Sequence, residues 1–230
     1  MQDKFPKCAI VIPVYNEKKC VTKVIGEIIS ATTSLRHILK TEIICVNDGS
    51  TDESGRILNG IKQISVINNS VKQGYGASIK KGIGQTDADW IMIIDCDNTY
   101  PAGKIYHLVT TALQGYDMVI AERNGENFRN DFLRGIVRRL LTLAVLIKTG
   151  IFFRDINSGM RIFRRTLFVQ YSSHLSNKFS FTTTLSYEMA RNKFNIGRIQ
   201  IIYGKRIGRS KMAFGDYFSI LYLMFTIIFG

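Results

Sequence analysis

The chain has 230 residues, of which 46% are hydrophobic, enough for one large domain with a sizeable core. Its four cysteines form no CxxC pair and its three histidines are scattered, so no zinc site is predicted. The net charge of +13 is uneven, because residues 1–122 carry 13 basic and 13 acidic side chains whereas residues 123–230 carry 18 and 5. A neutral half joined to a basic half predicts that the second half faces an anionic partner, such as phosphates, an acidic membrane or nucleic acid.

The first half alternates predicted strands with predicted helices. This pattern predicts an α/β fold with a mostly parallel sheet flanked by helices. Cys8, Cys45 and Cys96 lie in these strands or at a strand end, which predicts buried free thiols. The expected strands are 8–12, 42–46, 64–67, 90–94 and 118–121, and the expected helices are about 19–33, 52–61, 75–85 and 102–114.

The second half begins with a predicted helix at Phe132–Thr149, which places Arg134, Arg138 and Thr142 on one stripe. This helix is too charged and its apolar part too short to cross a bilayer, which takes about 20 apolar residues. It is either a basic amphipathic helix in a membrane interface or an ordinary packed helix. Strands at 160–163 and 199–203 and a helix at 182–193 are expected to follow.

The last residues form an apolar tail. Between 212 and 230 the only charged side chain is Asp216, and 217–229 is an uncharged apolar stretch of 13 residues. Such a stretch is long enough to anchor a chain but too short to span a bilayer. We therefore assign 1–212 to one α/β domain, and 213–230 to a membrane-associating tail or the start of a transmembrane segment.

Asp95 and Asp97 come directly after the apolar run 90–94. Residues 98–101, which end in Pro101, follow them and are typical of a turn. Carboxylates at the exit of a buried strand lie where open α/β sheets bind ligands. Oxygen ligands suit Mg²⁺ or Mn²⁺, which proteins often hold through one or two carboxylates plus substrate phosphates. We therefore predict a divalent metal at Asp95 and Asp97.

Two further strand ends face the same edge of the predicted sheet. The first strand ends in the motif Pro13-Val14-Tyr15-Asn16-Glu17, and the second in Asn47-Asp48-Gly49-Ser50-Thr51-Asp52. Asp48 can accept hydrogen bonds from a ribose or a base edge. Each motif alone also fits a plain turn, whereas their order before an Asp-x-Asp motif is specific.

With these motifs the chain resembles family 2 glycosyltransferases of the GT-A fold, which are Rossmann-like. The resemblance implies that Pro13, Tyr15, Glu17 and Asp48 bind the nucleotide, and that the two aspartates manage a diphosphate through the metal. The Gly74-Tyr75-Gly76-Ala77 motif is interpreted as a glycine-opened helix. Its N-terminus at Gly76, and Lys72 or Lys80, are expected near a sugar nucleotide.

The second half is similar to polyprenyl-phosphate glycosyltransferases, the group that includes dolichol-phosphate mannose synthase. The similarity implies that Arg123, Arg134 and Arg138 bind a lipid phosphate, with Arg206 and Lys211 in a matching loop. One departure is Thr99, which stands where a relative carries a glutamine, so a third protein ligand to the metal is not predicted. The motifs that carry this similarity are 155–161, 179–184 and 206–211.

Asp155 matches the acid near the acceptor in that group. It is predicted either to position a substrate or act as a weak base, or to form a structural ion pair with Arg161 or Arg154.

The resemblance implies transfer, with inversion, of one sugar from a UDP- or GDP-linked donor to undecaprenyl or dolichyl phosphate at the cytoplasmic membrane face. Two alternatives stay open: a glycosyltransferase with a non-lipid acceptor, and a non-catalytic module that binds phosphate or membranes. Nucleic acid is not an expected partner, and assembly into a homo-oligomer stays open.

Overall fold

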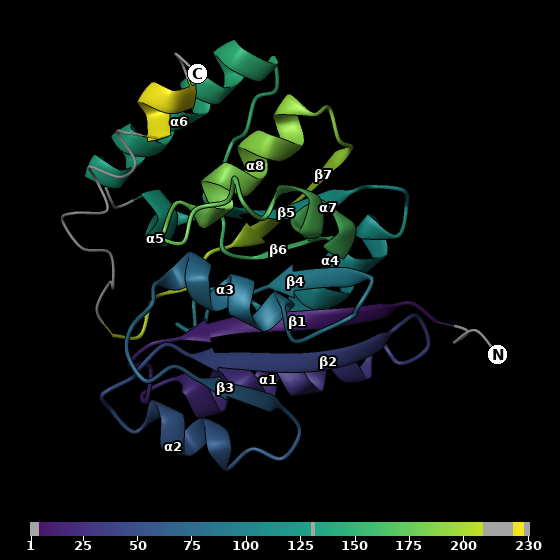
Figure 1. Cartoon of the computed structure of the whole chain (residues 1–230), viewed down its shortest axis with the longest axis vertical. Coiled ribbons are helices and arrows are strands. Elements are labelled where there is room, and N and C mark those ends of the chain that lie inside the picture. Colours follow the sequence, from purple (N-terminus) through teal and green to yellow (C-terminus); the bar gives the residue numbers. More distant parts are fainter. Residues whose placement is uncertain (1–4, 130–131, 209–222, 228–230) are drawn as a thin grey trace.

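The computed structural model of the chain describes residues 5–129, 132–208 and 223–227, apart from the side chains of 129 and 132–134. Within these ranges seven strands form one sheet in the order β3-β2-β1-β4-β6-β5-β7 (Figure 1). Strand β6 runs antiparallel to both of its neighbours, and the other pairs are parallel. The predicted, mostly parallel sheet is therefore confirmed. The strands are β1 Lys7–Val14, β2 Lys40–Asn47, β3 Ser65–Asn68, β4 Trp90–Ile93, β5 Met118–Asn124, β6 Arg161–Arg164 and β7 Ile196–Ile202.

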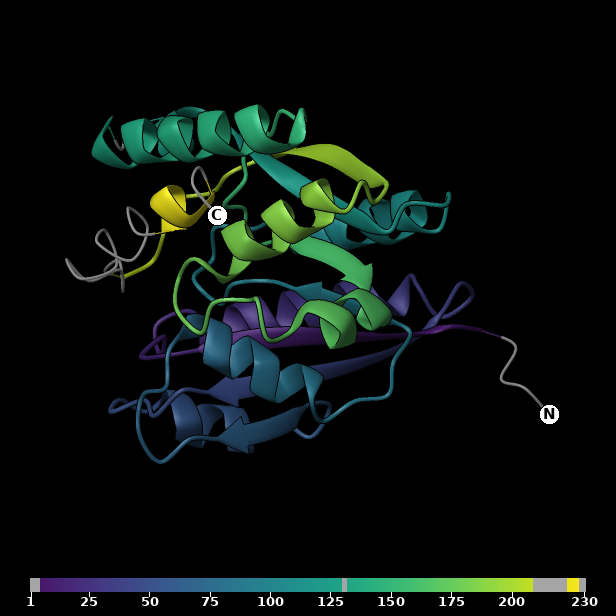
Figure 2. The same cartoon turned by 45° about the horizontal axis from the view of Figure 1, so that its top comes forward.

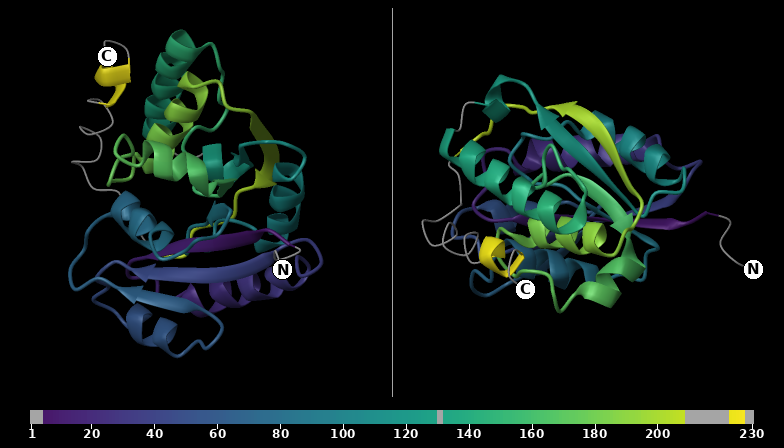
Figure 3. Two further views of the ribbon diagram at one scale, coloured as in Figure 1. Left: turned by 45° about the vertical axis from the view of Figure 1, so that its right-hand side comes forward. Right: turned by 90° about the horizontal axis from the view of Figure 1, so that it is seen from above.

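Helices cover both faces of the sheet (Figure 2). On one face the apolar sides of α1 and α4 join a core cluster that runs across the sheet from β2 to β5, and on the other face those of α3, α6 and α8 join a second such cluster. Helices α6 and α8 contact each other and lie side by side over the sheet (Figure 3). The result is a three-layer α/β domain, as predicted. The helices are α1 Val21–Thr33, α2 Ser54–Asn59, α3 Tyr75–Ile83, η1 Ala102–Lys104, α4 Ile105–Ala112, α5 Glu126–Arg129, α6 Phe132–Thr149, α7 Arg165–Tyr171 and α8 Phe181–Arg191.

The structure differs from the predicted elements in the length of one strand and in two short helices. Strand β5 extends past the predicted end at 121, because Glu122 and Arg123 pair in register with Gln200 and Ile201 of β7. Helices α5 and α7 were not predicted, since helices of four and seven residues are too short to show a periodic pattern. The predicted buried thiols are confirmed, and Cys20 is buried as well.

The apolar tail is described only at 223–227, which form a helical turn. Ile227 is buried in the same cluster as Leu141 and Val145 of α6, whereas Phe225 is exposed. The rest of the predicted tail, 213–222 and 228–230, lies outside the described residues. No helix within the described ranges combines the length and hydropathy that crossing a membrane requires.

The first turn of α3 lies directly under the loop before α8. A Cβ atom on Gly76 would overlap the backbone carbonyl oxygen of Ser176, and the Ala77 amide donates to the Asn177 carbonyl at 2.9 Å. Only glycine therefore fits at position 76, because a backbone carbonyl cannot rotate out of the way as a flexible side chain can.

We expect Gly76→Ala to lower the free energy of unfolding by about 1–3 kcal/mol, the usual cost of overpacking. Gly26→Ala is the matched control, because Gly26 lies in α1 and a Cβ atom added there would meet no other atom within 4 Å. That change should raise the free energy of unfolding by about 0.5–1 kcal/mol. Urea unfolding of both variants measures the difference, and equal effects of the two changes would contradict the steric argument.

Candidate functional site

A pocket, here called the carboxylate pocket, opens at the carboxyl ends of β1, β2 and β4. The structure brings together in its wall the residues predicted from three separate strand ends, and adds Arg206 from the segment after β7. Lys72 also lines it, with its ammonium 4.5 Å from the centre of the Tyr15 ring. The pocket is lined by Pro13, Val14, Tyr15, Glu17, Asp48, Lys72, Tyr75, Ser78, Asp95, Cys96, Asp97, Phe179 and Arg206.

Asp95 is a partly buried residue in the wall of this pocket. Its Oδ1 accepts a hydrogen bond from the Tyr75 hydroxyl at 2.8 Å. Burial and the neighbouring negative charge of Asp97 raise the pKa of Asp95 to about 6. A Cβ atom on Gly159 would overlap the Asp95 carboxylate, so the chain just before β6 packs directly against this group.

Asp97 is held from both sides. Its Oδ1 accepts hydrogen bonds from the Thr99 hydroxyl at 2.5 Å and the Thr99 amide at 3.1 Å. Arg206 lies 3.1 Å from its Oδ2 and 3.4 Å from Oε1 of Glu17, so one guanidinium bridges two acids. Thr99 therefore orients Asp97 in this structure.

The pair of aspartates suits a hard divalent cation. Asp97 is buried and the neighbouring Asp95 is partly buried, which leaves a local excess of negative charge that a cation would relieve. No group of three or more His, Cys, Asp or Glu in the described ranges is arranged to hold a metal. The protein would thus supply one or two carboxylates, as it commonly does for Mg²⁺ bound together with substrate phosphates.

We expect Mn²⁺ affinity to fall about tenfold between pH 7 and pH 5, because a carboxyl group with a pKa of about 6 is mostly protonated at pH 5 and must lose its proton to bind a metal. Titration calorimetry with MnCl₂ at the two pH values measures this. Asp95→Asn should bind Mn²⁺ more weakly and lose most of the pH dependence. An equal Mn²⁺ affinity at both pH values in the unaltered protein would contradict the assignment.

Two buried polar atoms in the pocket wall have no hydrogen-bond partner among the described residues, Ser78 Oγ and Arg206 Nε. The third such atom in the described ranges, Arg165 Nε, lies outside this pocket. Since buried polar groups are nearly always hydrogen-bonded, the two atoms suit a polar ligand.

A second cavity of about 420 Å³, here called the arginine cavity, lies between β5, α6 and the segment before β6. Its cationic side chains are accompanied by phenylalanines and leucines. Arg138 lies over the Phe128 ring at 3.9 Å, and Arg123 over the same ring at 4.9 Å. The lining residues are Arg123, Asn124, Phe128, Arg138, Arg139, Thr142, Leu143, Leu146, Phe152, Phe153 and Arg154.

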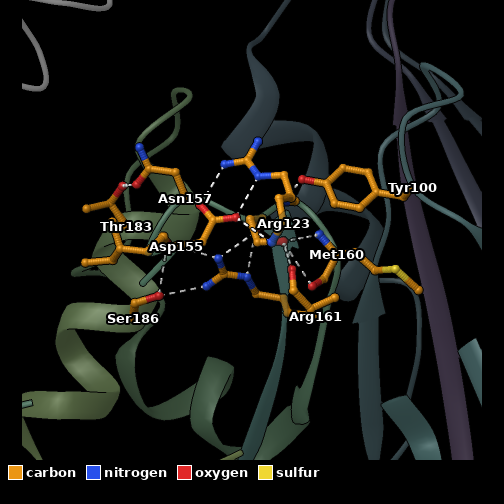
Figure 4. Close-up of polar contacts among 12 residues, drawn as sticks. Tyr100, Arg123, Asp155, Asn157, Met160, Arg161, Thr183 and Ser186 are labelled. Atoms are coloured by element: carbon orange, nitrogen blue, oxygen red, sulfur yellow. Dashed lines mark hydrogen bonds and ion pairs between the residues drawn. The ribbon is translucent and has the colours of Figure 1, made fainter. Parts of the chain in front are cut away.

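Asp155 binds Arg123 through both carboxylate oxygens (Figure 4). The Nε···Oδ2 distance is 2.7 Å and the Nη2···Oδ1 distance is 2.8 Å, and the Arg123 amide donates to Oδ2 at 3.1 Å. Burial favours the neutral acid, but Arg123 outweighs it and holds the pKa of Asp155 below its usual value. Such a carboxylate is poorly suited to accept a proton and well suited to orient Arg123.

Asp155 does form an ion pair, but its partner is Arg123. The predicted partners, Arg161 or Arg154, are wrong. The Arg161 guanidinium donates to carbonyl and hydroxyl oxygens. Sequence reasoning missed this because Arg123 lies 32 positions before Asp155 and meets it only through the pairing of β5 and β6.

Some predicted residues lie elsewhere. Helix α3 begins directly after Gly74, as the interpretation of a glycine-opened helix predicts. Gly76 is covered by the loop before α8 and does not line the carboxylate pocket, so its expected place near a sugar nucleotide stays a prediction. Lys80 donates to the Leu175 carbonyl at 2.5 Å, away from this pocket. The Arg134 side chain and Lys211 lie outside the described residues, so their predicted roles stay predictions.

The residues of the pocket wall that were not predicted as site residues include Tyr75, Ser78 and Phe179. The Tyr75 and Phe179 rings stack with centroids 5.6 Å apart. Both stand inside motifs that carry the family resemblance, so their positions were a usable signal. Ser78 had no such signal, since a single serine in a helix is common in any sequence.

The chain is similar to known proteins in sequence and in fold. Residues 9–172 match the family described as Glycosyl transferase family 2. The undecaprenyl-phosphate 4-deoxy-4-formamido-L-arabinose transferase of Proteus mirabilis is 27% identical over 97% of this chain and 68% of its own length. The enzyme of the same name from Pseudomonas paraeruginosa is 31% identical over 96% of this chain and 63% of its own length. For another such relative, from Pseudomonas fluorescens, the matched share of its length is 47%.

Among solved structures, glucosyl-3-phosphoglycerate synthase from Mycobacterium tuberculosis, in complex with Mg²⁺ and UDP, is similar with a TM-score of 0.70. The match covers 97% of this chain and 78% of that one at 19% sequence identity. At this identity the likeness concerns the fold, and it confirms the predicted GT-A-type α/β architecture.

Proposed function

Because the chain belongs to glycosyl transferase family 2, we propose that it transfers one sugar from a nucleotide-sugar donor to a polyprenyl phosphate at the cytoplasmic face of a membrane. The observation that carries the proposal is the composition of the arginine cavity. It combines Arg123 and Arg138 with the apolar walls of Phe128, Leu143 and Phe153. A phosphate joined to a long apolar chain needs both kinds of surface. The names of the relatives, which act on undecaprenyl phosphate, support the same acceptor class.

The carboxylate pocket is the proposed donor site. Pro13, Tyr15, Glu17 and Asp48 would contact the nucleoside, and the unpartnered Ser78 hydroxyl offers a further polar contact. A divalent cation held by the two aspartates would offset the charge of the leaving diphosphate. The solved neighbours contain UDP with Mn²⁺ or Mg²⁺, which supports a UDP-linked donor, with GDP as the alternative.

The acceptor needs orientation more than activation. A phosphate monoester has a second pKa of about 6 and is mostly dianionic at pH 7. One of its oxygens would attack the anomeric carbon as the bond from that carbon to the diphosphate oxygen breaks, and the nucleoside diphosphate leaves with the electron pair. Arg123 and Arg138 would hold the phosphate for this step, and Asp155 would keep Arg123 in place. Arg134, Arg206 and Lys211 are proposed as further cations around the two substrates.

The exposed side of α6 is the proposed membrane-facing surface. Ile136, Leu140, Leu143 and Ile147 recur at intervals of four, three and four residues and are all exposed, Ile147 by 71%. This spacing places them on one stripe of the helix. The stripe borders the arginine cavity through Leu143, so a lipid chain could pass from the membrane to the arginines. The tail 213–230 is proposed as a second contact.

A donor and acceptor panel tests the function directly. Purified protein is incubated with Mn²⁺, radiolabelled UDP- or GDP-sugars and a short, detergent-soluble prenyl phosphate, and lipid-linked sugar is measured by extraction. Asp97→Asn is the inactive control, since it removes one metal carboxylate without a change in volume. Transfer to a soluble acceptor alone would favour the non-lipid alternative. Binding of donor and acceptor with no turnover would favour a non-catalytic module.

We expect Arg138→Ala to raise the KM for prenyl phosphate about tenfold or more, because a hydrogen bond to a charged group is worth about 1.5–3 kcal/mol. The KM for the sugar nucleotide should change by less than about twofold, since Arg138 is in the described lining of the arginine cavity and not in that of the carboxylate pocket. Arg56→Ala is the matched control, because Arg56 is an exposed arginine of α2 paired with Glu53. Equal effects on both substrates would instead assign Arg138 a folding role.

We expect the double change Leu140→Gln and Ile147→Gln to weaken binding to anionic vesicles by about tenfold, because burial of each large apolar side chain contributes about 1.5–3 kcal/mol when complete. Val169→Gln is the control, since Val169 is equally exposed but lies on α7. Flotation with vesicles of phosphatidylglycerol measures binding, and UDP titration checks the fold. Undiminished flotation of the double variant would move the membrane contact to another part of the chain.

A further inference from the structure

Arg161, the first residue of β6, is completely buried and donates its hydrogen bonds to backbone carbonyl and hydroxyl oxygens (Figure 4). Its Nε donates to the Ser158 carbonyl at 3.0 Å, and its Nη2 to the same carbonyl at 2.5 Å and to that of Ile156 at 3.2 Å. Its Nη1 donates at 2.9 Å to the Thr182 carbonyl and at 2.9 Å to the Ser186 hydroxyl. These bonds use all five N–H donors of the guanidinium.

A buried arginine at this position costs free energy, because its charge is removed from water. Burial lowers the pKa of Arg161 to about 10, so it still carries its charge at pH 7 without a carboxylate directly bound to it. An apolar side chain would avoid burying a charge, but it would remove both Arg161 donors from the Ser158 carbonyl. It would also leave the carbonyls of Ile156 and Thr182 with the Ser186 hydroxyl as their side-chain donor. The specific result of having arginine here is thus a fixed backbone at 156–158, tied to the first turns of α8.

The segment that Arg161 fixes reaches both pockets. At one end Asp155 binds Arg123 of the arginine cavity through both oxygens. At the other end Gly159 packs against the Asp95 carboxylate of the carboxylate pocket, with no room for a side chain between them. The Gly159 amide also donates to the Tyr100 hydroxyl at 2.6 Å, which fastens that end of the segment.

We propose that Arg161 is a positioning residue that sets the spacing between Asp95 at the donor site and Arg123 at the acceptor site. The proposal rests on the function proposed above, in which those residues serve the two substrates. Neither substrate would contact Arg161 itself. Since a misplacement of about 1 Å between reacting groups can cost about 100-fold in rate, a residue that fixes this spacing acts on the transfer step and not on the affinity for either substrate.

Arg161→Lys tests the proposal, because lysine keeps the charge but has three donors on a flexible stem in place of a planar fork with five. We expect single-turnover transfer at saturating substrates to fall by about 10- to 100-fold. The separately titrated Kd values for UDP and for prenyl phosphate should stay within about threefold. Arg164→Lys is the matched control on the same strand, since Arg164 pairs with Asp117 at the other end of the sheet, and it should leave the rate unchanged.

The stoichiometry of UDP binding counts the folded sites and so separates positioning from unfolding. Three outcomes would overturn the proposal. The first is a loss of UDP sites in proportion to the loss of rate, and the second is a rate within about threefold of that of the unaltered protein. The third is a rise in both Kd values with an unchanged rate at saturation. If Arg161→Lys does not fold, Ser186→Ala takes its place, because it removes one acceptor of Arg161. That variant should show the same pattern with a smaller fall in rate.

Hydrogen exchange keeps this test separate from the test of the function. If the unaltered protein transfers no sugar to prenyl phosphate, the proposed function fails, and exchange at the amides of 156–159 then decides the role of Arg161. Exchange at least tenfold faster in Arg161→Lys, with unchanged UDP affinity, supports Arg161 as the residue that fixes the segment. Unchanged exchange overturns it.

Discussion

The paired negative charge of Asp95 and Asp97 is the constraint around which the rest of the site is arranged. Two neighbouring carboxylates, one partly buried and one buried, are unfavourable unless neighbouring groups compensate them. Tyr75 donates a hydrogen bond to Asp95, and the positive charge of Arg123 lowers the pKa of that carboxyl group. Thr99 and Arg206 bind Asp97. These groups come from α3, from the turn after β4, from β5 and from the segment after β7. Compensation of one pair of charges therefore involves elements from most of the fold.

Strand β6 connects this site to the second cavity. Because it enters the sheet antiparallel between β4 and β5, the segment before it passes from the edge of β5 to the end of β4. Asp155 therefore meets Arg123 while Gly159, four residues later, meets Asp95. A parallel strand in this place would present its other end to the site, and the segment before it would no longer contact both Arg123 and Asp95.

The two pockets differ in chemistry in the way that the proposed substrates differ. The carboxylate pocket holds acidic groups together with unpartnered polar atoms, which suits a polar, charged donor bound with a cation. The arginine cavity has cations and aromatic rings but no acidic residue among its described lining, which suits an anionic head group on an apolar chain. The described lining of the arginine cavity comes from the basic half alone, whereas the carboxylate pocket is lined mostly by the neutral half, with Phe179 and Arg206 from the basic half.

Local sequence determined the α/β class, the order of most elements and the gathering of Pro13, Asp48, Asp95 and Asp97, because parallel strands deliver their carboxyl ends to one edge and the motifs stand at those ends. It could not determine which charges pair across the fold. The Asp155–Arg123 and Arg206–Asp97 contacts join residues 32 and more than 100 positions apart. The covering of Gly76 by the loop before α8 and the burial of Arg161 likewise depend on how β6 and α8 pack. Strand pairing and helix packing decide such contacts, since hydrophobic periodicity specifies which face of an element is buried but not which neighbour it meets.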